Sequence, residues 1–241
     1  GLSANRAVRR RVRSRSNESC FIRTGKELVL ATRAFAKESA VKSRWALVST
    51  ALLLGFSMAS AMMPLHWGGR LCASILSGLL IVRLFVLYHD HQHHAILAGS
   101  RFAKWLMKGW GLVVLAPPTI WKHSHNQHHT HNAKLRDESP GSFPVMTSER
   151  YFGASFWERL RYRVSRHALT LAFGYVTVFI VGMCIAPMVQ SPRKHYDGAF
   201  ALLLHAGIYV VVVMAIGWTA GVFGLLLPFG MAYALGSYLF Y

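Results

Sequence analysis

Histidine is the residue type whose distribution in this chain could support chemistry. Nine of the 13 histidines lie in two short segments, HDHQHH at 89–94 and KHSHNQHHTHN at 122–132. Neutral imidazole binds iron, zinc, copper and nickel. If the fold brings the two segments together, their side chains surround one small volume with metal ligands.

The spacing within each segment selects the predicted ligands. Residues three or four apart lie on one face of a helix, so His89 pairs with His93, and His125 groups with His128 and His129. No cysteine and few carboxylates lie nearby. Nitrogen-rich ligation with vacant positions favours an oxygen-activating iron centre over a closed structural zinc site.

The other histidines in and around the two segments have less certain roles. They could hydrogen-bond to a ligating residue, act as alternative ligands or lie at the interface: His91, His94, His123 and His131. Asp90 adjoins a predicted ligand, and we favour a carboxylate that accepts an imidazole N–H over a surface charge. The isolated histidines are predicted to be interfacial or packed: His66, His167, His195 and His205.

Long apolar segments must position these clusters. Residues 46–63 and 71–88 predict a transmembrane hairpin, which brings the chain to His89 on the side where it began. Further apolar runs occupy 168–189, 199–217 and 219–240. If all three span, the chain ends on the far side; if one lies in the interface, the chain ends near the histidines.

The fold class predicted is an all-α integral membrane protein, with transmembrane helical hairpins and a cytosolic histidine-box cap. We expect a basic N-terminal segment at 1–44, with an amphipathic helix within 20–44, and one membrane domain at 45–241. Residues 102–120 are predicted to lie along the interface or partly buried, and the polar residues 123–166 to lie in the cytosol.

The formal charge is +18, and residues 1–44 hold 12 Lys and Arg against three acids. A basic flank beside apolar spans places that end, and the histidine boxes, on the cytoplasmic side of a multi-pass membrane protein. Nucleic-acid binding is disfavoured, because the same chain enters a membrane. An organelle-targeting segment at 1–20, rich in Arg and Ser, is an alternative.

With these two histidine segments between apolar runs, the chain resembles the membrane fatty acid desaturases, and bacterial acyl-lipid desaturases in particular. HDHQH at 89–93 is similar to their first histidine box (H-D-x-x-H), and HNQHH at 125–129 to their second (H-x-x-H-H). Three further segments are similar to these desaturases: FIRTGKELVLATRAFAKES, LYHDHQHHAILAGSR and GSFPVMT. The resemblance runs from about residue 20 to the end.

The resemblance implies a set of ligands, cofactors and partners. It implies that iron is bound by His89, His93, His125, His128 and His129. Two irons would lie on the cytosolic face, with molecular oxygen as co-substrate and a ferredoxin- or cytochrome-type electron donor. The product would be a double bond in an acyl chain of a membrane lipid or thioester.

The family has a third H-x-x-H-H box after its last spans, and the printed sequence reaches Tyr241 without one. We therefore expect either a fragment of a longer protein or a chain that is inactive alone. Rival interpretations are a histidine-box lipid or carotenoid hydroxylase, an inactive fragment, and a metal-binding membrane protein such as a transporter. A transporter would carry its polar residues inside the spans.

One basic group has two interpretations. It could dock an acidic electron donor, or it could flank the span at 168 under the positive-inside rule. Its members are Lys122, Lys134, Arg159, Arg161, Arg163 and Arg166.

Overall fold

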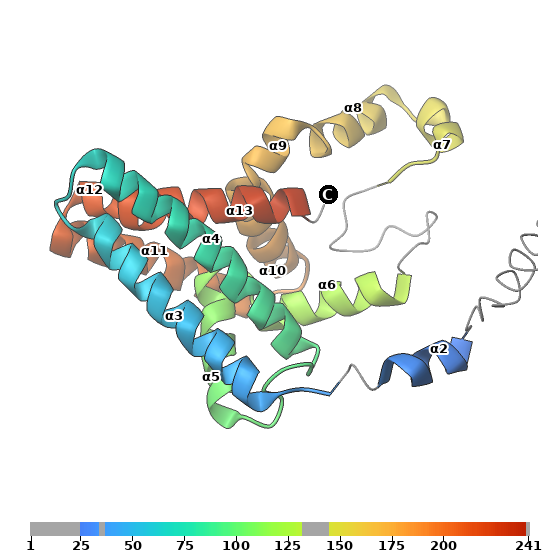
Figure 1. Ribbon diagram of the computed structural model, residues 1–241. Helices are drawn as coiled ribbons and strands as arrows, with labels where there is room; N and C mark the ends of the chain where they lie inside the picture. Colours follow the sequence, from blue (N-terminus) through green and yellow to red (C-terminus); the bar gives the residue numbers. More distant parts are fainter. Residues whose placement is uncertain (1–24, 34–36, 132–144, 240–241) are drawn as a thin grey trace, which may run out of the picture. The chain divides into compact units, whose positions relative to one another are not determined.

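The computed structural model describes residues 25–33, 37–131 and 145–239, except for the side chains of Leu28 and residues 125–131. The chain divides into two units, Gly1–Glu38 and Ser39–Tyr241. The described ranges form helices and no strand, as Figure 1 shows for each unit. This confirms the predicted all-α class.

The second unit contains the helices that matter for the site, two of which are π-helical segments (η). Their bounds are α3 Ala40–Met62, α4 Trp67–Gln92, α5 Arg101–Val113, α6 Pro118–His131, α7 Ser148–Gly153, α8 Phe156–Ser165, α9 Ala168–Ala172, η2 Tyr175–Ile185, α10 Ala186–Gln190, α11 Asp197–Ile216, α12 Trp218–Gly221, η3 Val222–Leu226 and α13 Leu227–Leu239. Within the described residues, four stretches are long and apolar enough to cross a membrane: Ala40–Met62, Trp67–Gln92, Asp197–Ile216 and Trp218–Leu239.

The first two spans form the predicted hairpin. Helix α3 ends before a short connection that contains Pro64, and α4 returns alongside it. The Ser77 hydroxyl donates to the Ser57 hydroxyl across the pair, at 2.9 Å. Near the turn, the buried Arg70 guanidinium donates to the Ala61 carbonyl at 3.0 Å, so a charge close to an apolar span has a backbone partner.

The last two spans form a second hairpin, which packs on the first. The chain reverses at Gly217, whose φ of 107° favours glycine, and this agrees with the break predicted there. The Ser74 hydroxyl of α4 donates to the Phe223 carbonyl of η3 at 2.6 Å. The turns of the two hairpins therefore lie at the same end of the bundle.

Both hairpins open at the other end, which carries His89. Leu239, the last residue of α13, lines the same cavity as His89. Asp197, the first residue of α11, bonds to Thr119 near the start of α6. We call this the histidine end. The described C-terminus lies there, which is one of the two topologies left open by the sequence.

The span predicted at 168–189 is not present. The segment is divided into α9, η2 and α10, and its apolar helix Tyr175–Gln190 is shorter than a span requires. In Figure 1, α9 and α10 lie on opposite sides of α13. At the start of the segment, the Ala168 carbonyl accepts from the Tyr238 hydroxyl near the C-terminus of α13. The segment then leads to Asp197, the first residue of α11. Both termini of the segment therefore lie at the histidine end.

The structure agrees in part with the helix predicted within 20–44, and it agrees with the partly buried segment predicted at 102–120. The helix expected within 20–44 is α2, Gly25–Thr32 in the first unit, while residues 37–39 are not helical and the first span begins at Ala40 rather than 46. Phe21 and Phe35 lie outside the described residues. Helix α5 is too short to span, and one face, with Ala103 and Met107, is buried, as expected for a partly buried interfacial helix.

Candidate metal centre and adjoining cavity

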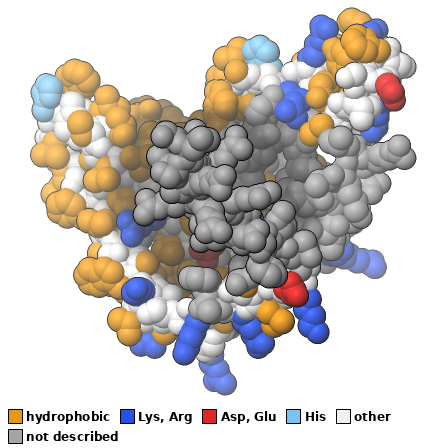
Figure 2. All heavy atoms as spheres, turned by 45° about the vertical axis from the view of Figure 1, so that its right-hand side comes forward, with side chains coloured by type: hydrophobic (Ala, Val, Ile, Leu, Met, Phe, Trp, Pro, Cys, Tyr) orange, Lys and Arg blue, Asp and Glu red, His pale blue; other side chains and the backbone are white. Residues whose placement is uncertain are grey.

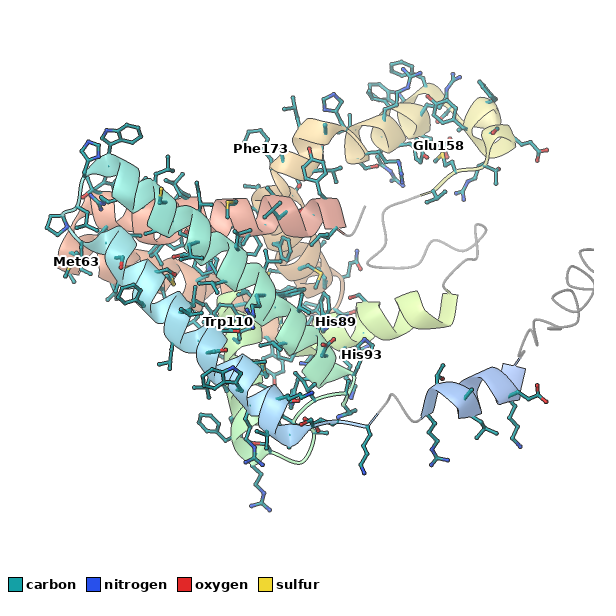
Figure 3. The ribbon with its side chains drawn as sticks, in the orientation of Figure 1. Met63, His89, His93, Trp110, Glu158 and Phe173 are labelled. Carbon is teal, nitrogen blue, oxygen red and sulfur yellow. The ribbon has the colours of Figure 1, made fainter. Side chains whose placement is uncertain are left out.

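The first histidine box lies at the C-terminal end of α4. His89 is in its last turn and His93 caps it, so the two residues are one helical turn apart. Their rings meet edge to face, with centroids 4.6 Å apart (Figure 3). The structure thus brings these two predicted ligands together, as their spacing predicts.

Asp90 contacts the first of these histidines. Its Oδ1 lies 3.1 Å from His89 Nδ1, and both side chains are partly exposed. In the tautomer that carries its proton on Nδ1, His89 donates to Asp90, and Nε2 is the ring nitrogen that would act as a metal ligand. A carboxylate that orients an imidazole in this way also makes it a stronger base.

The other two histidines of the first segment point elsewhere. His91 is buried, and its Nδ1 lies 3.0 Å from the Ile96 carbonyl, so it holds the turn that follows α4. His94 is exposed and has a φ of 57°. This φ lies in the left-handed region, which histidine, asparagine and aspartate tolerate better than most residues.

The second box lies on α6. For His125, His128 and His129 the structure describes the helical backbone only. Counted from Trp121, these positions are i+4, i+7 and i+8, which is the spacing of a single helix face. Lys134 lies outside the described residues.

Trp121 joins the start of α6 to the end of α4. Its buried ring contacts Phe85 edge to face, with centroids 5.1 Å apart, and lies 6.1 Å from the Tyr88 ring and 6.3 Å from the His89 ring. The two helices that carry the boxes therefore pack together where α4 ends. The face of α6 that begins at Trp121 starts beside the first box.

A buried aspartate anchors the N-terminus of α6. Asp197 of α11 accepts the Thr119 backbone N–H at 3.0 Å and the Thr119 hydroxyl at 2.6 Å. His195 Nδ1 lies 3.4 Å from the same hydroxyl, and its ring lies 6.1 Å from that of His123. Burial and the Lys194 ammonium lower the pKa of His195, so it is neutral near pH 7.

The link between α5 and α6 is fixed by side chains from other helices. The Tyr88 hydroxyl donates to the Ala116 carbonyl at 3.1 Å, and His205 Nδ1 lies 2.7 Å from the Val113 carbonyl. His205 also bonds to the Tyr175 hydroxyl. Since Tyr88 directly precedes His89, the first box and the entry to the second share one rigid support.

Sequence analysis missed most of this support. Asp197 received no role, and His195 and His205 were predicted only to be interfacial or packed. Both histidines are indeed packed. Nothing local identifies the Thr119 contact, because its partners are 78 residues apart. The one available signal was an aspartate placed directly before an apolar span, where an unpaired charge is costly.

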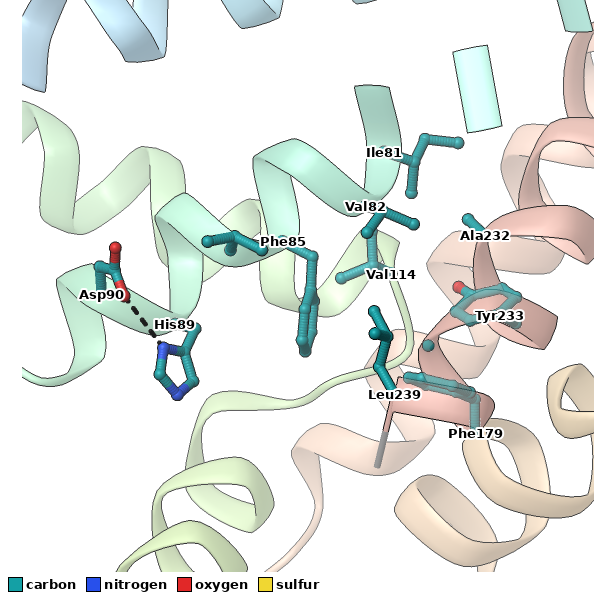
Figure 4. Close-up of a pocket in the computed structure, with 12 residues that line it drawn as sticks. Ile81, Val82, Phe85, His89, Asp90, Val114, Phe179, Ala232, Tyr233 and Leu239 are labelled. Carbon is teal, nitrogen blue, oxygen red and sulfur yellow. Dashed lines mark hydrogen bonds and ion pairs between the residues drawn. The ribbon is translucent and has the colours of Figure 1, made fainter. Parts of the chain in front are cut away.

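An apolar cavity opens beside the first box (Figure 4). Its volume is about 330 Å³, at the lower end of the roughly 300–1,000 Å³ of small-molecule sites. His89 and Asp90 lie at one end, and Phe179 and Tyr233 lie further along. Gly236 also lines the cavity, beside Phe179. The remaining lining residues are Ile81, Val82, Phe85, Val86, Val114, Ala232 and Leu239.

The described side chains fit one part of a metal centre. Among them there is no group of three or more histidine, cysteine, aspartate or glutamate residues that could hold an ion, and three predicted ligands lie outside this test. The His89 and His93 rings are adjacent, each could supply a ring nitrogen as a metal ligand, and both side chains are at least partly exposed. A site with imidazoles from α6 would suit an iron with vacant positions.

The comparisons with known proteins identify the family. The sequence model of the family described as "Fatty acid desaturase" matches residues 65–241, and the chain therefore belongs to this family. It is 27% identical over 112 residues to a "Fatty acid desaturase" of Bacillus subtilis (strain 168). That match covers 46% of this chain and 32% of the relative. No solved structure matches.

Proposed function

We propose that this protein acts in oxygen-dependent desaturation of an acyl chain at a histidine-ligated di-iron centre. The observation that carries the proposal is the adjacent His89–His93 pair, of which His89 lines one end of an apolar cavity, with the Trp121 face of α6 beginning beside it. The proposed ligands are these two histidines together with His125, His128 and His129, and family membership supports the assignment.

The described residues of the site each have a defined role in this proposal. His89 and His93 bind iron through imidazole nitrogen, and Asp90 fixes the ring and tautomer of His89. Bound iron with oxygen supplies the oxidising power that an unactivated C–H bond requires. The apolar side chains of Ile81, Val82, Phe85 and Val86 exclude water and hold adjacent methylenes beside the histidines.

The substrate class follows from the cavity. An acyl chain has no polar groups along its length, and beyond His89 and Asp90 the cavity wall is almost entirely apolar. We propose an acyl chain of a membrane lipid or thioester. Reducing oxygen to water while two hydrogens leave the chain needs two further electrons, and we propose that a ferredoxin- or cytochrome-type donor supplies them.

Charge supports a cytoplasmic position for the histidine end. The described cations of that end are Lys42, Arg44, Arg101, Lys104, Lys108, Lys122, Arg150, Arg159, Arg161, Arg163, Arg166, Arg193 and Lys194. The connections at the opposite end, 63–66 and 217, contain no lysine or arginine, and the described cation near them is Arg70, in the first turn of α4. By the positive-inside rule, this asymmetry orients both hairpins with their open ends inward.

The test is to express the full-length gene in a host of defined fatty acid composition and to map new double bonds. We expect new unsaturated chains from the native protein and none from His93→Ala. The matched control is His94→Asn. His94 is exposed, and asparagine also tolerates its left-handed backbone conformation, so this variant should retain the product. Unchanged lipids with iron and reductant supplied would overturn the proposal, and hydroxylated chains would assign a hydroxylase instead.

A further inference from the structure

Helix α8 presents large apolar side chains that the fold leaves exposed. Phe156, Trp157, Leu160 and Val164 lie within one arc of the helix, at i, i+1, i+4 and i+8. Their exposed fractions are 64%, 74%, 38% and 53%. We call these four residues the α8 arc.

Arginines flank the α8 arc on both sides. In the helical register, Arg159 and Arg163 lie beyond one edge of the arc and Arg161 beyond the other. Glu158 lies opposite and closes a capping box, in which the Ser155 backbone N–H and hydroxyl donate to its carboxylate at 2.8 Å. The sole acid of the helix is therefore used to cap its N-terminus.

Side-chain contacts hold α7 and α8 together. The Arg163 Nε donates to the Tyr151 hydroxyl at 2.6 Å, and the Tyr151 and Tyr162 rings lie 5.7 Å apart. Hydrophobic and cationic side chains gather at the upper right of Figure 2, where α7 and α8 lie. These contacts give the exposed arc a defined shape.

The C-terminal end of α8 adjoins the membrane part of the chain. The Thr170 hydroxyl of α9 donates to the Val164 carbonyl at 2.6 Å, and the Ala168 carbonyl accepts from Tyr238 at the end of α13. Helix α8 thus ends at the histidine end of the spans. That is the level at which a bilayer presents its headgroups.

We propose that α8 lies in the surface of an anionic bilayer, with the α8 arc in the boundary between headgroups and acyl chains. Arginine side chains on either side reach up to the phosphates while their stems cover apolar surface. An acidic protein would pair with the arginines but would set its polar surface against four large apolar side chains. The inference does not depend on desaturase activity.

The test uses trypsin on the full-length protein in vesicles of phosphatidylcholine, with or without phosphatidylglycerol. Cleavage after Arg159, Arg161 and Arg163 is followed by mass spectrometry. Arg193 and Lys194 are internal controls, because they are exposed in a loop at the same end of the bundle. We expect phosphatidylglycerol to slow cleavage in α8 roughly tenfold through its attraction for the arginines, and to change cleavage of the loop less than twofold.

A double variant, Trp157→Ser with Leu160→Ser, should remove the protection that phosphatidylglycerol gives α8. A parallel rise in loop cleavage would reveal general unfolding, and the native protein in the two lipids then decides the result. Equal α8 cleavage in the two lipids would overturn the proposal. Protection that requires an added acidic protein would also overturn it, and would assign the arginines to protein docking.

Discussion

At the scale of single residues, the chemistry depends on His89 and the groups around it. The four-residue spacing of His89 and His93 predicted their contact, because helix geometry alone brings such residues together. The contact between Asp90 and His89 could be proposed from adjacency but needed the rotamers to be established. The burial of His91 could not be predicted, because it depends on the turn that follows α4.

The role of Asp90 can be tested with Asp90→Ala in the full-length protein. Loss of a carboxylate that orients a ligating imidazole typically lowers metal affinity roughly 10–100-fold. We expect a loss of this size for iron, measured by competition with a chelator. Asp90→Asn retains a hydrogen-bond acceptor and should lose less, and native affinity in Asp90→Ala would rule out the orienting role.

The cavity can be tested at Gly236. A Cβ there would meet Phe179 at an ordinary contact distance of 3.5 Å, so a side chain can enter the cavity without displacing the backbone. We expect Gly236→Leu to shift the products toward shorter chains or to abolish them, in analyses of total fatty acids. Gly230→Leu, on the same helix but outside the cavity lining, is the matched control. The same loss from both variants would contradict the assignment of the cavity.

At the scale of elements, α6 is positioned by contacts that lie far apart in the sequence. Hydropathy predicted the first hairpin and the break near Gly217, because long apolar runs and glycine act locally, and it left open whether both runs around Gly217 span. It failed at 168–189, where composition suits a span but the segment packs across the bundle. A Cβ at Gly174 would overlap the Ser237 side chain, so η2 approaches α13 closely. Such packing depends on tertiary partners that hydropathy does not represent.

The anchor of α6 can be tested with Asp197→Ala. The change removes the two hydrogen bonds that join the buried Asp197 carboxylate to the exposed Thr119, at a cost of about 1–3 kcal/mol. We expect a lower free energy of unfolding in detergent, and a double variant with Thr119→Ala that costs less than the sum of the two single changes. Glu149→Ala, at an exposed position, is the control. Strict additivity would show that the two side chains do not interact.

At the scale of the whole molecule, the four candidate spans of the described residues place the basic connections between them at one end. The sequence left the number of crossings after residue 168 undecided, since five apolar runs gave two topologies. The structure gives an even number of candidate crossings, because the apolar run at 168–189 returns to the end of the bundle from which it starts. The resulting charge asymmetry is the physical basis for the proposed orientation.

This topology predicts the labelling of single cysteines in intact cells. In a background without native cysteines, Leu65→Cys should react with an impermeant reagent from outside. His94→Cys and Arg193→Cys should react only after permeabilisation, because both lie at the histidine end. Opposite accessibility of positions 94 and 193 would mean that 168–190 crosses the membrane after all.

The central claim is that the two histidine boxes bind iron together. The most direct measurement is the iron content of the purified full-length protein, compared with that of His93→Ala, His128→Ala and His94→Asn. We predict that iron is present in the native protein and in His94→Asn, and is depleted by loss of either box. A native protein without iron, or depletion from one box only, would contradict the claim.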